Sequence, residues 1–502
     1  MNTKPQAYDT KTLAEINKMT NAVDGNTQFK KWPNWYKRIL LISPRYDAFI
    51  VAPHLGLGYL ATALRRAGHE VTLMDGLRQE VKYDPSGFDL VAITAMSTYF
   101  PEACAEVRKA KAFGLPVIIG GPHVLAEPQT SLTQSGADYV CVGEGDIAIV
   151  EISSGMPPEQ IPGIAYKKDG QFVTNPTRGF SLNLDSFGSP AWDLIDPRTY
   201  PIAPHGMTAK EWPLAPIITT RGCPYRCSYC SAPITAGGSM RYRNPEYVVD
   251  EIEMLVNKYG VKEIQIEDDN FTFSRAHAVS VCEEIIRRKI KVCWSLPNGV
   301  RIDRLDPELL ALMQKSGCYL MALGIESANQ RILDIVKKKL DKEIVRKVVR
   351  DVIDSGIEAW GFFMVGFPTE TREEIVNTIE FALSLPLTRV QFTKTTPLPG
   401  TPIYEVWKNE YSGGKTIDWS RFNYYDFNPQ WSAVSGEEIS KLQRWGHKRF
   451  YGRPKNFMHI LMRMKPQQYG MLLKRVTRLW GSRSGDGLRK KSPEFQPSVS
   501  LQ

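Results

Sequence analysis

Three cysteines within eight residues form the group in this chain most able to carry chemistry. Cys223, Cys227 and Cys230 are separated by three and two residues, and they follow a strand-like run at Ala215–Thr220. Three thiolates on one short loop can bind three irons of a cubane iron–sulfur cluster and leave one iron open for a small molecule. A structural zinc site would need a fourth cysteine or histidine nearby, and the next histidine is His277. The spacing therefore indicates an open iron–sulfur cluster.

This loop resembles the signature of the radical S-adenosylmethionine (SAM) enzymes, in which an aromatic residue precedes the third cysteine, as Tyr229 does here. The resemblance implies a [4Fe-4S] cluster whose open iron binds SAM through its amino and carboxylate groups. One electron then cleaves SAM to a 5′-deoxyadenosyl radical, which takes hydrogen from the substrate. It also implies an external electron donor, a flavodoxin or a ferredoxin.

Residues 213–405, which contain this loop, alternate short apolar runs with helical patterns. Six such strand–helix units predict a partial (β/α)6 barrel with its chemistry at the carboxyl ends of the strands. The turns at those ends resemble the SAM-binding edges of radical SAM barrels. The resemblance implies that these edges contribute Tyr229, Asp268, Asp269, Arg301, Glu326, Ser327 and Gly366 to SAM binding.

The charges of SAM assign roles within that set. Asp268 or Asp269 would face the methionyl amino group, and Glu326 would face the ribose hydroxyls. Arg301 would pair with the methionyl carboxylate, because a guanidinium fork suits a carboxylate. For each acidic residue a solvated loop or a helix cap is the alternative role.

Residues 38–150 alternate short buried strands with helices, which predicts a doubly wound, Rossmann-like parallel sheet. Such sheets bind ligands beyond the carboxyl ends of their strands. Those ends contain Ser97–Thr98, Gly120–His123 and Gly143–Asp146, which offer glycines and hydroxyls. No G-x-G-x-x-G motif opens the first helix, which disfavours a dinucleotide site.

Because it precedes a radical SAM loop, this domain resembles the cobalamin-binding domain of B12-dependent radical SAM enzymes. The D-x-H-x-x-G signature is absent, since Ala52 stands where Asp would precede His54. The resemblance therefore implies cobalamin with no protein histidine on cobalt. The competing interpretations are a sheet that no longer binds anything, and hydrogen-bonded structural roles for the two histidines. The implied cobalamin-binding residues are His54, Leu55, Gly56, Ser97, Thr98, Gly120, Gly121, Pro122, His123, Gly143, Glu144 and Gly145.

The remaining segments are expected to support these two domains. Residues 1–37 are interpreted as an N-terminal arm, and residues 151–212 as a linker with a β-hairpin. Residues 406–481 are expected to be helical, and residues 482–502 form a basic tail expected to be disordered. The chain is therefore α/β: a Rossmann-like domain, a partial barrel and a helical C-terminal region.

The net charge of +9 is concentrated near the C-terminus, where residues 441–491 contain 15 Lys or Arg and one acid. A basic amphipathic helix there could lie on an anionic membrane surface or pack on the barrel. Its apolar stripe consists of Tyr469, Leu472, Leu473, Val476, Leu479 and Trp480.

The composition favours a cytoplasmic enzyme with no nucleic-acid partner, and it leaves membrane association open. No apolar run reaches the ~18 residues of a membrane-spanning helix, and the first residues lack a signal core. The cysteines outside the cluster loop are interpreted as small core residues of a reducing compartment, namely Cys104, Cys141, Cys282, Cys293 and Cys318.

The combined motifs predict a cobalamin-dependent radical SAM methyltransferase. It would methylate an unactivated carbon, or a phosphinate phosphorus, of a small molecule, for which the basic tail favours a lipid or another hydrophobic compound. The principal rival function is oxidative cyclisation or ring rearrangement, as in the similar anaerobic tetrapyrrole cyclases. A tRNA methylthiotransferase and a non-catalytic cobalamin-binding protein are less favoured. No side chain is assigned as a proton donor.

Overall fold

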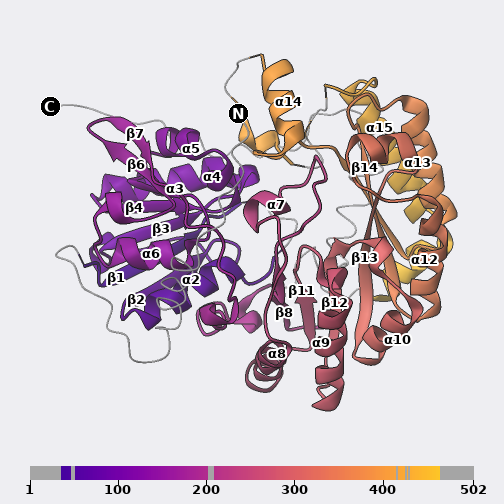
Figure 1. The fold of residues 1–502 in the computed structure, drawn as a ribbon, viewed down its shortest axis with the longest axis horizontal. Coiled ribbons are helices and arrows are strands. Elements are labelled where there is room, and N and C mark those ends of the chain that lie inside the picture. The colour runs from indigo at the N-terminus through magenta and orange to yellow at the C-terminus, as the bar shows by residue number, and fades with distance from the viewer. Residues whose placement is uncertain are drawn as a thin grey trace.

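The computed structural model describes residues 35–46, 51–201, 209–413, 417–423, 427 and 430–463 of the 502-residue chain. Two α/β domains lie side by side, and helices from the C-terminal region cover parts of both (Figure 1). The α/β class and the order of the domains agree with the prediction. Most of the N-terminal arm, the basic amphipathic helix and the basic tail lie outside the described residues.

The first domain is built on a seven-stranded sheet of order β2-β1-β3-β4-β5-β6-β7. Its first five strands are parallel, and β6 and β7 join antiparallel as a hairpin that extends the sheet from β5. The hairpin therefore belongs to the first sheet. The strands are β1 (Arg38–Ser43), β2 (Glu70–Asp75), β3 (Leu90–Thr94), β4 (Val117–Gly120), β5 (Tyr139–Cys141), β6 (Ile164–Lys168) and β7 (Gln171–Thr174).

Helices cover both faces of this sheet, which explains why its central strands are apolar without alternation. Along β1, Ile39 and Leu41 pack in the hydrophobic core that includes α2 and α6, whereas Leu40 and Ile42 pack in the core that includes α3 and α5. The sheet is thus doubly wound, as predicted. The helices are α2 (Leu55–Arg66), α3 (Phe100–Ala112), α4 (Pro122–Ala126), α5 (Pro128–Ser135) and α6 (Gly145–Ser153).

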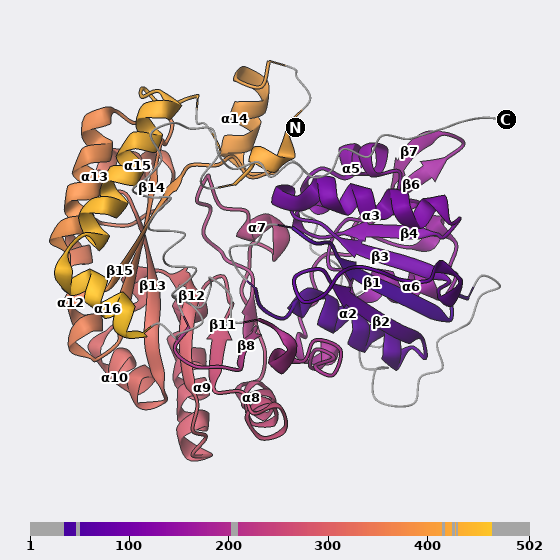
Figure 2. The same ribbon diagram turned by 180° about the vertical axis from the view of Figure 1, so that it is seen from behind.

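The second domain is an open barrel of six parallel strands in the order β15-β14-β13-β12-β11-β8. The strands are β8 (Leu214–Ile217), β11 (Glu263–Ile266), β12 (Cys293–Val300), β13 (Cys318–Glu326), β14 (Glu358–Val365) and β15 (Arg389–Lys394). Helices line its outer side (Figure 2). They are α8 (Pro245–Tyr259), α9 (Arg275–Arg287), α10 (Pro307–Lys315), α11 (Gln330–Ile335), α12 (Glu343–Asp354) and α13 (Arg372–Ser384). This arrangement is the predicted (β/α)6 architecture.

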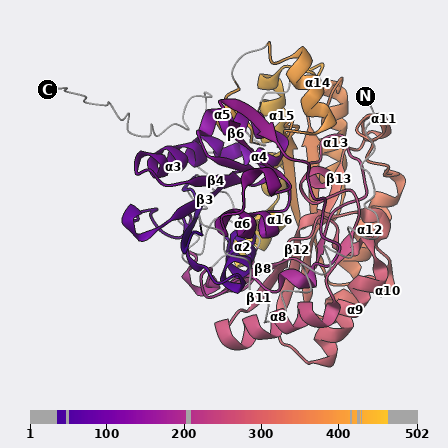
Figure 3. The same cartoon turned by 60° about the vertical axis from the view of Figure 1, so that its left-hand side comes forward.

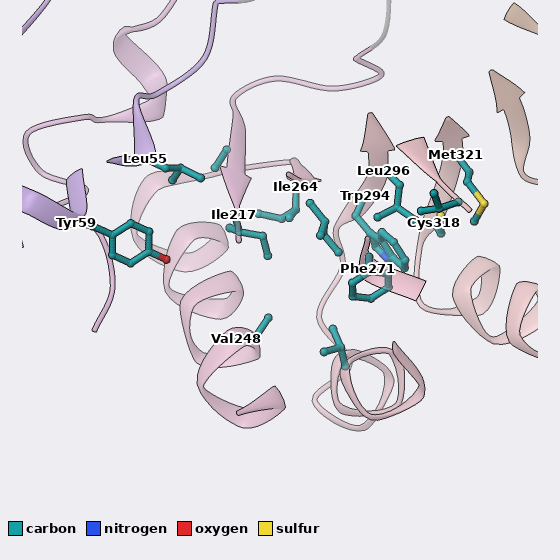
Figure 4. Close-up of a cluster of buried hydrophobic side chains, with 14 of the residues drawn as sticks. Leu55, Tyr59, Ile217, Val248, Ile264, Phe271, Trp294, Leu296, Cys318 and Met321 are labelled. Carbon is teal, nitrogen blue, oxygen red and sulfur yellow. The ribbon is translucent and has the colours of Figure 1, made fainter. Parts of the chain in front are cut away.

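The cores of the two domains are continuous. Leu55 and Tyr59 of α2 belong to the same buried cluster as Ile217 and Ile264 of the barrel (Figure 4). Helix α2 also approaches the linker closely, since a Cβ on Gly58 would lie 2.7 Å from the Ile195 side chain. Burial of this shared apolar surface holds the carboxyl ends of both sheets in a defined relation.

The C-terminal region binds both domains. It contains α14 (Pro402–Glu410), α15 (Gly436–Tyr451) and α16 (Pro454–Arg463). Helix α15 packs on β15, where Gln443 donates a hydrogen bond to the Phe392 carbonyl at 2.8 Å. Helix α14 lies at the top of the views in Figures 1 and 3, and its Lys408 pairs with Glu127 of the first domain at 2.9 Å. No described helix is both long and apolar enough to cross a membrane.

A buried group of aromatic side chains, called here the aromatic bridge, fills the space beside α14. It joins the core of the first domain that contains α3, and Trp431 donates from its indole to the Gly366 carbonyl of the barrel at 2.8 Å. The bridge therefore touches both domains. Its members are Tyr404, Trp407, Trp419, Phe422, Phe427 and Trp431.

Candidate functional site

The cysteine loop follows β8 and a short ribbon of β9 (Thr220–Arg221) paired with β10 (Arg241–Tyr242), and it precedes α7 (Ala232–Thr235). Backbone hydrogen bonds hold the loop, from Cys223 N–H to the Gly237 carbonyl at 3.1 Å and from Ser228 N–H to the Val336 carbonyl at 2.9 Å. Gly222 has a φ of +98°, and a Cβ there would lie 2.2 Å from the Ser239 carbonyl oxygen. The path of the loop therefore requires glycine at this position.

The three thiols are half-buried and suit a cluster that supplies positive charge. Burial raises the pKa of Cys223, and it raises the pKa of Cys230 to about 12. A coordinating metal deprotonates such thiols outright. In the described residues, no three His, Cys, Asp or Glu side chains are grouped to hold one metal ion, and the cysteines of a cubane cluster bind different irons.

The two adjacent aspartates after β11 have different surroundings. Asp268 is buried, and its two carboxylate oxygens accept hydrogen bonds from Thr219 N–H at 2.7 Å and from the Thr219 and Thr220 hydroxyls at 2.5 and 2.8 Å. Burial raises the pKa of Asp268 to about 6, and these hydrogen bonds oppose the shift. Asp268 therefore fastens the ends of β11 and β8 together.

Asp269 is exposed and reaches toward the cysteine loop. Desolvation raises its pKa, while a hydrogen bond from Gly222 N–H and the charge of Arg241 favour the carboxylate. Its charge also raises the pKa values of Cys223 and Cys230, which places it beside the loop. Of the two aspartates, Asp269 is the one whose carboxylate can meet an ammonium group at the cluster.

Glu326, at the end of β13, forms a buried ion pair with Lys338 at 2.8 Å. The Tyr229 hydroxyl also hydrogen-bonds to Glu326. Although burial lowers it, the charge of Glu326 leaves the pKa of Lys338 raised. Lys337 and Lys339 flank Lys338 with φ values of 55° and 51°, so the backbone is strained on both sides of the buried lysine. In the sequence Lys338 is one of three consecutive lysines, and no local signal distinguishes it.

The Arg301 guanidinium is already occupied. It binds the Asp303 carboxylate at 2.9 and 3.1 Å and the Lys338 and Lys339 carbonyls at 2.6 and 2.8 Å. Its face lies 3.7 Å from the Tyr225 ring centroid. These contacts hold the strained lysine segment and the cysteine loop together. These bonds use four of the five guanidinium N–H groups, so a bidentate pair with the methionyl carboxylate would require Arg301 to give up one of these partners.

Ser327 and Gly366 contribute to the same edge of the barrel mainly through local structure. The Ser327 hydroxyl bonds the Thr378 hydroxyl at 3.2 Å and accepts from Asn329 N–H at 3.1 Å. Gly366 has a φ of +81°, and its N–H donates to Glu370 at 2.6 Å. The structure thus places Ser327 in a hydroxyl network beneath the edge and Gly366 in a turn.

Glu370 was not identified from the sequence. One of its oxygens accepts from the N–H groups of Gly366 and Phe367, at 2.6 and 3.0 Å, and its other oxygen is buried without a hydrogen-bond partner among the described residues. Burial raises the pKa of Glu370 to about 8. An acidic residue four positions after a strand-ending glycine is the signal that could have revealed it.

The strand ends expected to bind cobalamin present backbone rather than side chains. Gly121 has a φ of +107°, and a Cβ there would lie 2.6 Å from the Ala95 carbonyl oxygen. Gly143 has a φ of +138°, and no atom of the described chain lies near the position of its Cβ. Gly120 is the last residue of β4, where a Cβ would lie 3.4 Å from the Cys141 side chain of β5, and Thr98 is half-exposed beyond β3. An open edge with few side chains fits a large flat cofactor, which would lie beyond the carboxyl ends of the strands.

Other residues expected at this edge have structural contacts. His54 caps α2 and accepts from Leu57 N–H at 3.3 Å, while Leu55 is buried in the core. The exposed Gly56 and Pro122 open the first turns of α2 and α4.

His123 is buried with its Nδ1 3.0 Å from the Ser97 hydroxyl. Its ring lies 4.1 Å from Phe100 and 4.5 Å from Trp419, as measured between ring centroids. Burial lowers the pKa of His123 to about 4, so the ring is neutral. His123 and Ser97 therefore support the strand end from beneath the aromatic bridge. Met96, which is 45% exposed beyond β3, is an apolar surface at the same edge that sequence reasoning missed.

Glu144 is the N-cap residue of α6, whose first residue is Gly145, and the Glu144 side chain faces the barrel. Glu144 accepts from Arg221 at 2.9 Å and from Arg241 at 2.8 Å, and these arginines lie on the two strands of the ribbon beside the cysteine loop. A Cβ on Gly145 would lie 3.3 Å from the Leu60 side chain. The carboxyl end of β5 in the first sheet thus meets the base of the cysteine loop directly.

Comparisons with known proteins agree with both halves of this site. The model of the radical SAM superfamily matches residues 217–382, and the model of the B12 binding domain matches residues 48–153. The fold is similar to that of the radical S-adenosylmethionine methyltransferase TsrM from Kitasatospora setae, solved with cobalamin and a [4Fe-4S] cluster. The TM-score is 0.64 at 20% identity, over 86% of this chain and 92% of that one.

Curated relatives match both domains over most of the chain. An uncharacterized methyltransferase of Pyrococcus horikoshii is 31% identical over 88% of this chain and 97% of its own length. The cytidylyl-2-hydroxyethylphosphonate methyltransferase of Streptomyces wedmorensis is 26% identical over 73% and 81%. An anaerobic magnesium-protoporphyrin IX monomethyl ester cyclase of Cereibacter sphaeroides is 27% identical over 82% and 70%. With both domains matched in this order, the chain belongs to the cobalamin-dependent radical SAM enzymes, whose cofactors are a [4Fe-4S] cluster, SAM and cobalamin.

Proposed function

We propose that this enzyme is a methyltransferase that methylates an unactivated carbon, or a phosphinate phosphorus, of a small molecule. The observation that carries the proposal is the contact of Glu144 with Arg221, which joins the glycine-rich edge of the first sheet to the cysteine loop. When bound, the cluster and SAM supply a radical that removes hydrogen, and cobalamin supplies a methyl group. A substrate bound between the two domains would meet the radical on the side of the barrel and the methyl group on the side of the first domain.

Side chains of the described site would hold the cofactors as follows. Cys223, Cys227 and Cys230 would bind the cluster. Asp269 would bind the SAM ammonium group, because a carboxylate has the opposite charge. Its neighbour Asp268 already accepts hydrogen bonds from Thr219 and Thr220. Glu326, held in place by its ion pair with Lys338, would accept from the ribose hydroxyls.

Cobalamin would lie on the backbone of the first sheet. We place it on the strand ends that offer least side-chain bulk, at Gly120, Gly121 and Gly143, with Thr98 and Met96 at the margin. The neutral His123 is covered by Phe100 and Trp419 and would support this edge rather than ligate cobalt.

The test begins with anaerobic reconstitution. About four irons and one cobalamin per chain are expected, together with reductive cleavage of SAM to 5′-deoxyadenosine. The enzyme is then incubated with deuterated-methyl SAM and a small-molecule extract, and products are sorted by mass. A product carrying the deuterated methyl group supports methyl transfer, whereas products formed without it contradict the proposal.

A second candidate function is oxidative cyclisation or ring rearrangement. It is favoured by the likeness to the cyclase of Cereibacter sphaeroides over 82% of this chain. The same experiment separates the two functions, because methylation replaces one hydrogen of the substrate by the deuterated methyl group and cyclisation adds no carbon.

We further propose two partners in a cytoplasmic setting, where the free thiols suit a reducing compartment. A flavodoxin or ferredoxin would supply the electron for SAM cleavage. A peripheral contact with an anionic membrane is supported by Phe457, Met458 and Met462 of α16, which are 44%, 46% and 74% exposed, close to the basic C-terminal segment. Sedimentation with anionic and neutral vesicles tests that contact, and equal binding to both would contradict it.

A further inference from the structure

We propose that Trp360 and Phe362 of β14 bind a flat, uncharged ring system of the substrate inside the barrel. This pair is called here the aromatic wall. The inference rests on the proposed methyltransferase function and narrows it in two ways. It names the class of substrate, and it favours carbon over phosphorus as the methylated atom.

The two aromatic side chains point into the barrel. Their neighbours along β14, Ala359 and Phe363, belong to the hydrophobic core that includes the helices outside, and successive side chains of a strand point to opposite faces. The rings of Trp360 and Phe362 contact each other, with centroids 4.8 Å apart and an angle of 80° between their planes. They therefore form one edge-to-face pair on the inner face of the sheet.

Solvent reaches the aromatic wall but not the layer beneath it. Trp360 and Phe362 are both half-buried. Two residues before Trp360, one row across four strands forms a closed floor. Its members are paired in register and are at most 7% exposed, namely Gln265, Ser295, Leu320 and Glu358. The inner face of the barrel is therefore filled below the wall and accessible at the level of the wall.

Small residues leave the faces of the two rings uncovered. On the neighbouring strand β13, Ala322 is paired with Trp360 and Gly324 with Phe362. On the next strand, a Cβ at Gly299 would lie 3.3 Å from the Phe362 ring. Larger side chains at these positions would cover the rings, so the wall presents aromatic surface on which a flat apolar ring can pack.

The wall lies beside the carboxylate proposed to bind the SAM ribose. A Cβ at Gly324, the partner of Phe362, would lie 3.0 Å from Oε1 of Glu326 and 2.9 Å from Nζ of Lys338. One small residue thus separates Phe362 from the ion pair of Glu326. A ring packed on the wall would lie next to SAM, where hydrogen can be removed from it.

The charges around the wall select against an anionic substrate. Glu267, which follows β11, is half-buried, and Asp269 is exposed farther along the same segment. The cations described near the wall are engaged in ion pairs, namely Lys338 with Glu326, Arg389 with Glu358 and Arg301 with Asp303. A phosphinate anion would meet two carboxylates there, and burying it without a paired cation is costly. A neutral ring gains from the burial of apolar surface.

The first test identifies the product that carries the deuterated methyl group. The holoenzyme is incubated with deuterated-methyl SAM and the small-molecule extract, and the labelled product is characterised by mass and by ultraviolet absorption. A conjugated ring with the label on carbon is expected. A labelled product that is aliphatic, or that carries the label on phosphorus, would overturn the role of the wall and leave the methyltransferase function intact. If no labelled product forms, the proposed function itself fails and the inference fails with it.

The second test compares Phe362→Leu with the matched control Phe381→Leu. Phe381 is a half-buried phenyl group of α13 on the outer side of the same sheet. Phe362→Leu should raise the KM for the compound purified from the extract about tenfold and leave the Kd for SAM unchanged. Phe381→Leu should change neither, and Trp360→Phe, which keeps a ring, should raise the KM less than Trp360→Leu. A higher Kd for SAM in Phe362→Leu would show that the wall binds SAM instead, and equal KM values in both Phe→Leu variants would also overturn the proposal.

Discussion

At the scale of single residues, the site shows how adjacent side chains of one type take different tasks. Asp268 and Asp269 are adjacent in the sequence. Asp268 accepts hydrogen bonds from Thr219 and Thr220, whereas Asp269 is exposed beside the cysteine loop. Successive side chains at the end of a strand point to opposite sides, so only one of the pair can face the cluster. Substitution should therefore affect the two positions in different ways.

Asp269→Asn should weaken SAM binding about ten- to hundredfold, because a charge-assisted contact contributes about 1.5–3 kcal/mol. Asp268→Asn should instead lower the thermal unfolding midpoint, since a buried acceptor of three hydrogen bonds is replaced in part by a donor. SAM titration and thermal unfolding of both variants measure these effects. Equal loss of SAM affinity in both variants would contradict the assignment.

The buried Glu370 makes stability depend on pH. Its pKa is raised to about 8 in the folded protein, so the folded state holds a proton that the unfolded state releases above pH ~4.5. The free energy of unfolding should therefore fall as pH rises from about 5 to 8, by at most ~1.4 kcal/mol per pH unit. Glu370→Gln carries no charge at any pH.

The measurement compares urea unfolding of the wild type and Glu370→Gln at several pH values in that window. The free energy of unfolding of the variant should rise relative to that of the wild type as pH rises. Any cost of the glutamine's amide hydrogens to the stability of the variant does not depend on pH. A difference that does not change with pH would show that Glu370 is ionised throughout.

At the scale of elements, the loops that carry the chemistry are held in place by hydrogen bonds from other segments of the chain. The cysteine loop is fixed by Gly237 and Val336 carbonyls, and the strained lysine segment is fixed by Arg301. Arg301 follows the end of β12, whereas Gly237 and Val336 follow the short helices α7 and α11. The backbone at Gly222 is the position where the loop has least freedom.

Gly222→Ala should reduce the iron content after anaerobic reconstitution to a small fraction of the wild-type value. A methyl group there would collide with the Ser239 carbonyl oxygen, and the φ of +98° disfavours any side chain. Gly238→Ala is the matched control, since no atom of the described chain lies near its Cβ position and its φ is not positive. Iron content and the absorption of the cluster measure both, and a fully loaded Gly222→Ala would contradict the requirement.

At the scale of the whole molecule, the C-terminal region adds a further connection between the two domains. The aromatic bridge packs into the first domain and bonds the turn at Gly366 through Trp431. Trp419 covers His123, which in turn supports the strand end proposed to bind cobalamin. Stability of the interdomain contact therefore depends on residues that come after the barrel in the sequence.

Trp419→Ala should lower the free energy of unfolding by about 3–5 kcal/mol, because it leaves a cavity where a buried indole was. It should also reduce cobalamin retention after gel filtration, since His123 loses its cover. Phe113→Ala is the control. Phe113 lies in the first domain, which also contains His123, and it is 58% exposed. Its loss should change the free energy of unfolding by less than about 0.5 kcal/mol. Equal effects of the two substitutions would contradict the role of the bridge.

The amino-acid sequence by itself determined the parts of this protein that are local. Cys223, Cys227 and Cys230 lie in one loop, so their spacing alone indicates a cluster. The alternation of buried strands and helices likewise predicts both parallel sheets, because each unit is a short continuous segment.

Only the tertiary structure decided which charged groups meet. The two carbonyls that Arg301 binds lie almost forty positions away, Glu144 binds Arg221 in another domain, and Trp419 covers His123. Contacts of this kind depend on the directions of side chains and on packing between distant elements, to which no local pattern corresponds. For that physical reason, the different surroundings of Asp268 and Asp269 and the contact of Glu144 with Arg221 are seen only in the folded chain.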